Sequence, residues 1–250
     1  MHAVPRATFL TTAILLPAIL PAPASALTGD EVLARMDKTI NGFADQAMDV
    51  TFTIVDVDGS KKSYDITVRQ KGDQKRLVRF TSGEMKGMAT LVEDRNRVYV
   101  YLPGFKKVRR VAAHNMNQSF AGSDLSNDDM ASVSWTALWD ATIEREDATA
   151  YHLACAPRPG ANAPYAKARV TVARDSFQQI GIEYFDAAGT LVRTWKMSGI
   201  REFHGVTRAA LIVVTDVRTG HRTEMHVRDF RVNQGFQDSL FTVRQLEWGE

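Results

Sequence analysis

Most of the chain alternates apolar and polar residues with the two-residue period of a half-buried β-strand. The pattern is clear where Met48, Val50 and Phe52 alternate with Asp49 and Thr51. The strands that the pattern predicts cover residues 48–54, 64–68, 77–80, 88–93, 97–102, 143–146, 151–156, 168–173, 178–185, 191–203, 206–217 and 222–232. Short turns rich in glycine separate many of them, so the chain is expected to form an antiparallel meander joined by hairpins.

Two segments break this alternation. Thr28 and Glu31 form a capping box ahead of apolar residues at helical spacing, which predicts an N-terminal helix. Residues 112–139 are polar and rich in turn residues, and a connection of this length inside a sheet is often functional. Within it, Ser126 and Asp129 are expected to cap a short helix.

A meander of this many strands curls into a barrel or half-barrel. One face of such a sheet is polar and meets water, whereas the other is apolar and must be filled by side chains, helices or a ligand. Few helices are available, because only the N-terminal helix, the region 126–139 and a short helix or turn at residues 237–240 are expected. The pattern therefore predicts an α+β, mainly β fold with an apolar inner face.

Residues 1–26 have the features of a cleavable secretory signal. An apolar run at residues 9–20 follows a weakly basic start and precedes the small-residue sequence Ala-Ser-Ala. The run is short for a membrane span and contains prolines, which disfavours a membrane anchor. Cleavage would leave Leu27 at the N-terminus, not a cysteine, so lipid modification is not indicated. We expect a mature, single-domain protein of residues 27–250 in the periplasm of a Gram-negative bacterium.

Composition narrows the classes of function. The chain has 31 Lys and Arg residues against 29 Asp and Glu residues, a formal net charge of +2. An exported protein with this balance is a poor candidate for binding nucleic acid. Cys155 is the single cysteine, so no internal disulfide forms, and stability has to come from a core that the 44% hydrophobic content can supply.

The sequence lacks the usual catalytic signatures: a nucleophile elbow, a zinc-protease motif, a phosphate-binding loop or a dinucleotide fingerprint. His221 and His226 lie five residues apart on one predicted strand, so they face opposite sides and disfavour a metal site. Asp124, Asp128 and Asp129 do not fit the calcium-loop pattern and are interpreted as acidic residues at a helix N-terminus. We therefore expect no enzyme activity, no cofactor and no metal.

A Pro103-Gly104 turn separates an aromatic strand from a cationic one. The four cations that follow it are Lys106, Lys107, Arg109 and Arg110. They are candidates for docking on a lipid head group or an anionic partner, and the alternative is a solvated basic strand that discourages edge pairing. Alternation places Arg109 and Arg110 on opposite sides, so the four cations do not all serve one ligand.

Flexible and aromatic side chains gather around this cationic hairpin in the sequence. The candidates for lining a lipid-sized cavity are Met85, Met88, Tyr99, Tyr101, Phe105, Met116 and Phe120. Methionine suits adaptable apolar surfaces, although for each of these residues taken alone a place in a filled core is favoured.

Two blocks of sequence resemble a known family. They are LVEDRNRVYVYLPGFKKVRRV at residues 91–111 and SFAGSDLSNDDM at residues 119–130. Together with the opening helix and the strand-rich second half, they are similar to the LolA-like outer-membrane lipoprotein-sorting proteins. The resemblance extends over essentially all of the mature chain. This chain is longer than the best-understood branch of the family, and its KKVRR and GSD segments indicate a distinct subgroup.

The resemblance implies an unclosed β-barrel with helices lying over an apolar cavity. The best-understood branch carries acylated lipoproteins across the periplasm, from an inner-membrane transporter to an outer-membrane acceptor, without catalysis or cofactor. The subgroup is associated with RND-type lipid exporters, which implies a free lipid as an alternative cargo. The cargo-gating arginine of the best-understood branch does not align with any one residue of this chain.

These observations predict a monomeric periplasmic carrier for the acyl chains of a lipid or lipoprotein, with residues 112–124 as a lid over the cavity. The expected partners are the cargo, an inner-membrane exporter and an outer-membrane acceptor. The alternative is an envelope sensor or interaction module that uses the same half-barrel to detect lipid or lipoprotein.

Overall fold

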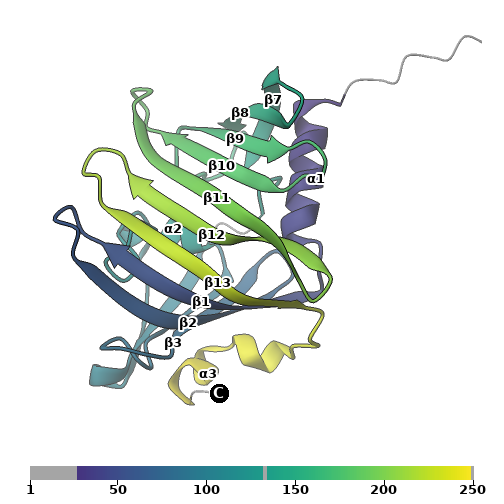
Figure 1. Ribbon diagram of the computed structural model, residues 1–250. Helices are drawn as coiled ribbons and strands as arrows, with labels where there is room; N and C mark the ends of the chain where they lie inside the picture. The colour runs from purple at the N-terminus through teal and green to yellow at the C-terminus, as the bar shows by residue number, and fades with distance from the viewer. Residues whose placement is uncertain (1–26, 132–133, 249–250) are drawn as a thin grey trace, which may run out of the picture.

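One antiparallel sheet of thirteen strands dominates the computed structural model, which describes residues 27–131 and 134–248 (Figure 1). The first strands are β1 (Asp45–Val55), β2 (Lys61–Lys71), β3 (Lys75–Phe80), β4 (Ala89–Asp94), β5 (Arg97–Leu102) and β6 (Lys107–Arg110). The later strands are β7 (Trp139–Glu146), β8 (Ala150–Pro157), β9 (Lys167–Ala173), β10 (Gln179–Phe185), β11 (Leu191–Phe203), β12 (Val206–Asp216) and β13 (Arg222–Val232). The predicted signal at residues 1–26 lies outside the described residues.

The strand order is β6-β5-β4-β3-β2-β1-β13-β12-β11-β10-β9-β8-β7. Every neighbouring pair except β1 and β13 is consecutive in the chain, which confirms the predicted meander. β1 and β13 join the two halves, with a register that runs from Gln46 opposite Val232 to Val55 opposite Arg222. β6 and β7 are the two edges of the sheet and do not pair, so the predicted barrel is unclosed, as expected.

Three α-helices and three short 3-10 helices accompany the described part of the sheet. They are α1 (Gly29–Asn41), η1 (Pro103–Phe105), η2 (Ala113–Asn115), α2 (Asn127–Ala131), η3 (Asp238–Phe241) and α3 (Val243–Trp248). The sequence predicted a short helix or turn at residues 237–240, where η3 lies, but it did not predict α3. No helix of the described residues is long and apolar enough to cross a membrane.

α1 begins at the predicted capping box. The Thr28 hydroxyl accepts from the Glu31 amide at 3.2 Å, and the Glu31 carboxylate accepts from the Thr28 amide at 2.8 Å. The helix packs on β7 and β8. Its apolar face joins a core cluster that includes Leu153 of β8 and Val170 of β9. Glycine is needed at position 29, because a Cβ there would lie 2.4 Å from the Ala141 carbonyl oxygen.

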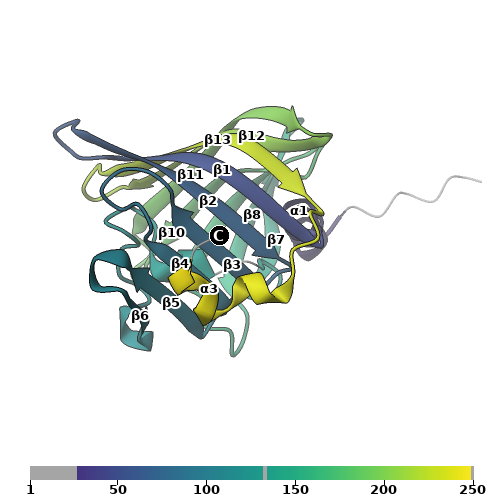
Figure 2. The same ribbon diagram turned by 90° about the horizontal axis from the view of Figure 1, so that it is seen from below.

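The two faces of the first six strands carry different cores. On one face, Phe52, Phe80 and Phe120 pack with ring centroids about 6 Å apart, from 5.9 to 6.3 Å. On the opposite face, Leu77 and Leu91 pack against η3 and α3. Figure 2 shows α3 lying across the outside of β3, β4 and β5, whereas residues from both halves of the sheet converge on the inner, concave face.

Candidate functional site

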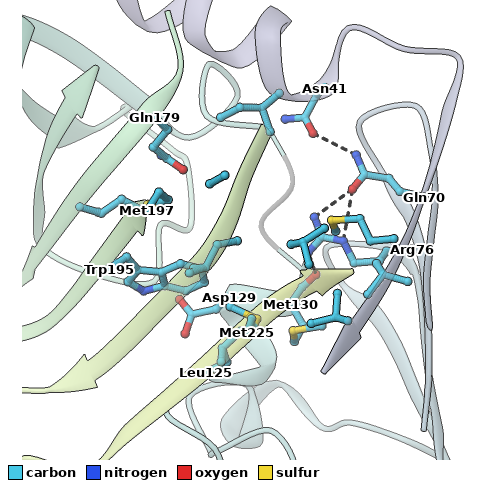
Figure 3. Close-up of a pocket in the computed structure, with 18 of the residues that line it drawn as sticks. Asn41, Gln70, Arg76, Leu125, Asp129, Met130, Gln179, Trp195, Met197 and Met225 are labelled. Carbon is cyan, nitrogen blue, oxygen red and sulfur yellow. Dashed lines mark hydrogen bonds between the residues drawn. The ribbon is translucent and has the colours of Figure 1, made fainter. Parts of the chain in front are cut away.

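A pocket of about 260 Å³ lies on the concave face of the sheet (Figure 3). Its walls come from β1, β2, β3, β10, β11, β12 and β13, together with the end of α1 and the segment between β6 and β7. Apolar side chains that line it include Met48, Val50, Ile66, Ile212, Met225 and Val227. Alternation explains this composition, because every second residue of each strand points to the concave face.

The cross-strand register places these apolar residues beside one another. Met225 pairs with Phe52 of β1 on one side and with Ile212 of β12 on the other. Met197 of β11 pairs in turn with Ile212, and Trp195 lines the pocket from the same strand, as Figure 3 shows. Flexible methionines on β1, β11 and β13 allow the pocket to adapt to the shape of an apolar ligand.

Arg76 is a half-buried cation in this apolar surface. Its Nη1 donates to the Met130 carbonyl at 2.9 Å, and its Nη2 donates to Gln70 Oε1 at 3.0 Å. Gln70 Nε2 in turn donates to Asn41 Oδ1 at 2.9 Å, as the dashed lines in Figure 3 show. Burial lowers the pKa of Arg76 to about 10. These contacts connect β3, β2 and the ends of α1 and α2 around one guanidinium.

Arg208 of β12 is a second half-buried cation at the pocket. Its Nη2 donates to the Ile40 carbonyl at 3.0 Å, at the C-terminal turn of α1. The guanidinium also lies over the rings of Phe43 and Phe230, at 5.4 and 4.7 Å from their centroids. Burial lowers the pKa of Arg208 to about 10. A cation at this position complements the partial negative charge of a helix C-terminus.

Asp129 is the acidic residue that lines the pocket. Its carboxylate accepts from the Ser126 hydroxyl at 2.8 Å and from Arg193 Nη1 at 2.9 Å. The Tyr165 hydroxyl donates to it at 3.2 Å, and the Tyr165 ring stacks on Tyr184 with centroids 4.0 Å apart. The predicted Ser126 and Asp129 cap of α2 is confirmed, and the buried ion pair with Arg193 of β11 extends it.

Asp124 fixes the same segment to β13. Its side chain is 4% exposed, and its Oδ1 lies 2.8 Å from His221 Nδ1. The Thr223 hydroxyl donates to Asp124 Oδ2 at 2.7 Å and accepts from the Asp124 amide at 2.9 Å. The segment that precedes α2 is therefore held against the sheet by a buried carboxylate and not only by apolar contacts.

Phe120 is the one predicted cavity residue that lines this pocket. Met85 and Met88 pack at the border of the concave core, and Met116 packs in a separate cluster. The structure does not bring Tyr99 and Tyr101 to the pocket: both face the other side of the sheet. The reason is that alternation assigns neighbouring strand residues to faces without indicating which face becomes concave.

Phe105 and the four predicted docking cations lie away from the main pocket, on the hairpin between β5 and β6. Phe105 is 69% exposed. Lys106, Lys107, Arg109 and Arg110 are all exposed too. A second, more open hollow at the base of this hairpin is lined by Met88, Arg109 and Arg110 together with Phe120. Phe120 thus forms a wall of both hollows.

The sequence patterns did not indicate Arg76, Arg208, Arg193 or His221 as residues of the site. Arg76 and Arg193 resemble ordinary strand cations, and only their burial against the helices distinguishes them. Asp124 and Asp129 were noted as helix-terminal acids, but their basic partners lie 97 and 64 residues further along the chain. No local spacing could have predicted such pairs.

Solved structures with similar folds cover nearly all of the described chain. A DUF1329 family protein from Desulfovibrio piger is 22% identical with a TM-score of 0.80, covering 87% of this chain and 97% of that one. A Vibrio parahaemolyticus domain named for outer membrane lipoprotein sorting is 20% identical with a TM-score of 0.75, covering 88% and 98%. A LolA superfamily protein from Nitrosomonas europaea is 20% identical with a TM-score of 0.74, covering 88% and 99%.

At 20% to 22% sequence identity, the structural similarity to these proteins establishes the fold of this chain. No curated protein matches the sequence significantly. A family model described as "Uncharacterized protein" matches residues 72–248, which is most of the chain. The chain has the LolA-like fold, as the sequence resemblance predicted, and it belongs to this family of uncharacterised proteins.

Proposed function

We propose that this protein is a periplasmic carrier that binds the acyl chain of a lipid or lipoprotein in the concave pocket. The observation that carries the proposal is the pocket itself, whose walls are apolar strand residues from both halves of an unclosed sheet. A concave, mainly apolar surface with a few polar groups is the usual form of a site for small amphiphilic ligands. The LolA-like fold supports the same proposal.

The size of the pocket limits the cargo in this state of the protein. Its volume of about 260 Å³ suits part of one acyl chain better than the three chains of a mature lipoprotein. Each buried methylene contributes about 0.8 kcal/mol, so a single chain can bind without any specific polar contact. A larger cargo requires the pocket to widen, which displaces the segment between β6 and β7.

Residues 112–124 act as the lid in this proposal. Phe120 from this segment fills the concave face between Phe52 and Phe80, where it takes the place that an apolar ligand would use. The segment is bonded to the sheet mainly through Asp124, whose contacts to His221 and Thr223 can break and reform without unfolding the strands. Hydrogen exchange in residues 112–124 should change on lipid binding, and unchanged exchange would contradict the lid.

Transfer of the cargo needs no catalytic group. The donor would be an inner-membrane exporter, such as an RND-type lipid exporter, and the acceptor a protein or lipid surface at the outer membrane. Release follows when the acceptor binds the acyl chain more tightly or when the lid moves, because a ligand shifts an equilibrium only through its differential affinity. A monomeric carrier is sufficient for this role.

The decisive experiment is native mass spectrometry of the protein purified from its own periplasm, followed by analysis of the lipids that accompany it. A stoichiometric acyl lipid or lipoprotein would support the carrier and define the class of cargo. An apo mass that takes up no added lipid would contradict it. The sensor or interaction module would then be the better interpretation, and the concave pocket would be an imperfectly filled core.

A further inference from the structure

The hairpin between β5 and β6 combines an exposed aromatic residue with a group of exposed cations. Phe105 is the only aromatic residue among the large, exposed hydrophobic side chains of the described residues. It is followed at once by Lys106 and Lys107, and Arg109 and Arg110 complete the strand. An exposed ring next to several positive charges is the composition of a surface that binds lipid at a membrane interface.

These cations are not neutralised within residues 27–131 and 134–248. No carboxylate of these residues forms a salt bridge with the four cations, and Arg110 donates instead to the Asn96 carbonyl at 2.9 Å. Several exposed arginines elsewhere on the sheet are paired with carboxylates, as Arg169 is with Glu144 at 2.8 Å. The positive charge of the hairpin is therefore available to an external partner.

The backbone presents these side chains at a protruding tip. η1 turns the chain at Pro103–Phe105, and Lys106 completes the reversal with a left-handed φ of 48°. A side chain at Gly104 would have no neighbouring atom within 4 Å. β6 is one of the two free edges of the sheet, and Figure 2 shows it on the opposite side of the molecule from α1. The tip is thus free to reach a flat surface.

We propose that this hairpin docks the protein on a membrane surface that contains anionic lipid. In this arrangement Phe105 enters the interface between head groups and acyl chains, and Lys106, Lys107 and Arg109 contact lipid phosphates. The apolar ring contributes binding that salt does not screen, whereas the cations contribute attraction that depends on the fraction of anionic lipid. Neither contribution depends on whether the concave pocket carries an acyl chain.

The shape of the surface favours a membrane over an acidic protein. A stable protein interface covers about 800 Å² on each partner and has an apolar centre. Here the exposed apolar surface is one ring at a narrow tip, and its surroundings are charged. A fluid bilayer accommodates such a tip without a complementary shape.

Docking through this hairpin would also bring the pockets close to the membrane. Arg109 lines the second hollow at the base of the hairpin, and Phe120 separates that hollow from the main pocket. A lipid leaving the bilayer beside the hairpin would meet Phe120 before it reached the concave face. The docking proposal stands without this route, because it concerns the outer surface only.

The test is flotation of the purified protein with vesicles of phosphatidylcholine alone and with vesicles that also contain phosphatidylglycerol. We expect binding to the anionic vesicles that decreases as salt is added. Phe105→Ala should weaken the partition coefficient about tenfold. Removal of the charges in Lys106→Gln and Lys107→Gln should weaken it about fivefold for each cation at low salt.

A second hairpin provides a matched control. Val57 at the turn between β1 and β2 is 65% exposed but lies between Asp56 and Asp58. Val57→Ala should leave vesicle binding unchanged, and a double Lys106→Arg, Lys107→Arg variant should retain it. Equal binding to neutral and anionic vesicles, or hairpin variants that bind normally, would overturn the proposal. Absence of vesicle binding combined with hairpin-dependent capture of an acidic protein would overturn it in favour of a protein partner.

Discussion

Two segments cover opposite faces of the strands around β3 and β4, and they differ in how many of the contacts that hold them are buried polar contacts. The inner segment, residues 112–131, packs Phe120 and Leu125 into the concave core and is also bonded to the sheet through the buried carboxylates of Asp124 and Asp129. The outer segment, residues 238–248, lies on the convex face and is held by an apolar cluster that includes Phe241 and Leu246.

The difference indicates which segment is suited to move. Apolar packing is lost only when the packed surface separates and meets water, so the outer segment should stay in place as long as the sheet is folded. Buried polar contacts can be exchanged for contacts with water or a ligand as the segment lifts. Because the inner segment also borders the pocket, we expect ligand binding to displace it, whereas the outer segment lines neither of the two pockets described above.

The largest effect is expected in the outer segment. Phe241 is 3% exposed, and Phe241→Ala should lower the free energy of unfolding by about 3–5 kcal/mol because it leaves a cavity. Denaturant titration measures this change, and lipid uptake by the folded protein should be retained. The exposed Val217 provides the control, since Val217→Ala should have little effect. A loss of less than about 1 kcal/mol would show that the outer segment is as loosely held as the inner one.

Filling the pocket should weaken ligand binding on the concave face without affecting the convex face. Met225→Trp places a bulky indole ring against Phe52 and Ile212, where it occupies part of the pocket. We expect acyl-chain binding to weaken at least about tenfold, a loss of about 1.4 kcal/mol. Fluorescent fatty-acid displacement measures the affinity, and thermal unfolding shows whether the variant is folded. Val57→Trp on an exposed turn is the matched control. Unchanged affinity in Met225→Trp would locate acyl binding elsewhere.

Removing a polar contact should loosen the inner segment alone. Asp124→Ala leaves the Thr223 hydroxyl and the His221 ring without their buried acceptor, at a cost of about 1–3 kcal/mol. Amide exchange should accelerate in residues 112–131 and stay unchanged in residues 238–248. The exposed turn residue Asp58 serves as a control, because Asp58→Asn should alter neither segment. Equal acceleration in both segments would mean that they unfold together.

The smallest effect is expected at the exposed end of the outer segment. A hydrogen bond from Lys75, followed by one from Lys71, lowers the pKa of Asp238. Any stabilisation from this depressed pKa is present near neutral pH and is lost as the pH falls through the folded-state value. Solvent screens these exposed groups, so Asp238→Asn should leave the denaturation midpoint at pH 7 unchanged. A clear decrease would indicate that charge, and not packing, holds the outer segment.

The sequence predicted the secondary structure of this protein well because the signals are local. Period-two alternation located each long strand, and the capping residues Thr28 and Ser126 located the starts of α1 and α2. The short α3 was missed, since six residues at the end of the chain carry too little periodicity to distinguish a helix from a turn.

The candidate site was less accessible to sequence reasoning. Of the residues predicted to line a lipid cavity, Phe120 lines the concave pocket, whereas Tyr99 and Tyr101 belong to the face under α3. The polar residues of the pocket were not predicted, because Arg76 and Arg208 gain their distinctive character only from burial beside the helix ends. The cationic hairpin was evident from the sequence, and the structure adds that its charges lack carboxylate partners among the described residues.

The sequence by itself determined the strands, their hairpin order and the LolA-like resemblance, because these follow from neighbours along the chain. Only the tertiary structure decided that β1 pairs with β13, and this pairing joins the two halves into one sheet. The curvature of that sheet decided which face is concave and encloses the pocket. The physical reason is that side-chain alternation defines two faces equally well, whereas the choice between them depends on long-range contacts that no local pattern encodes.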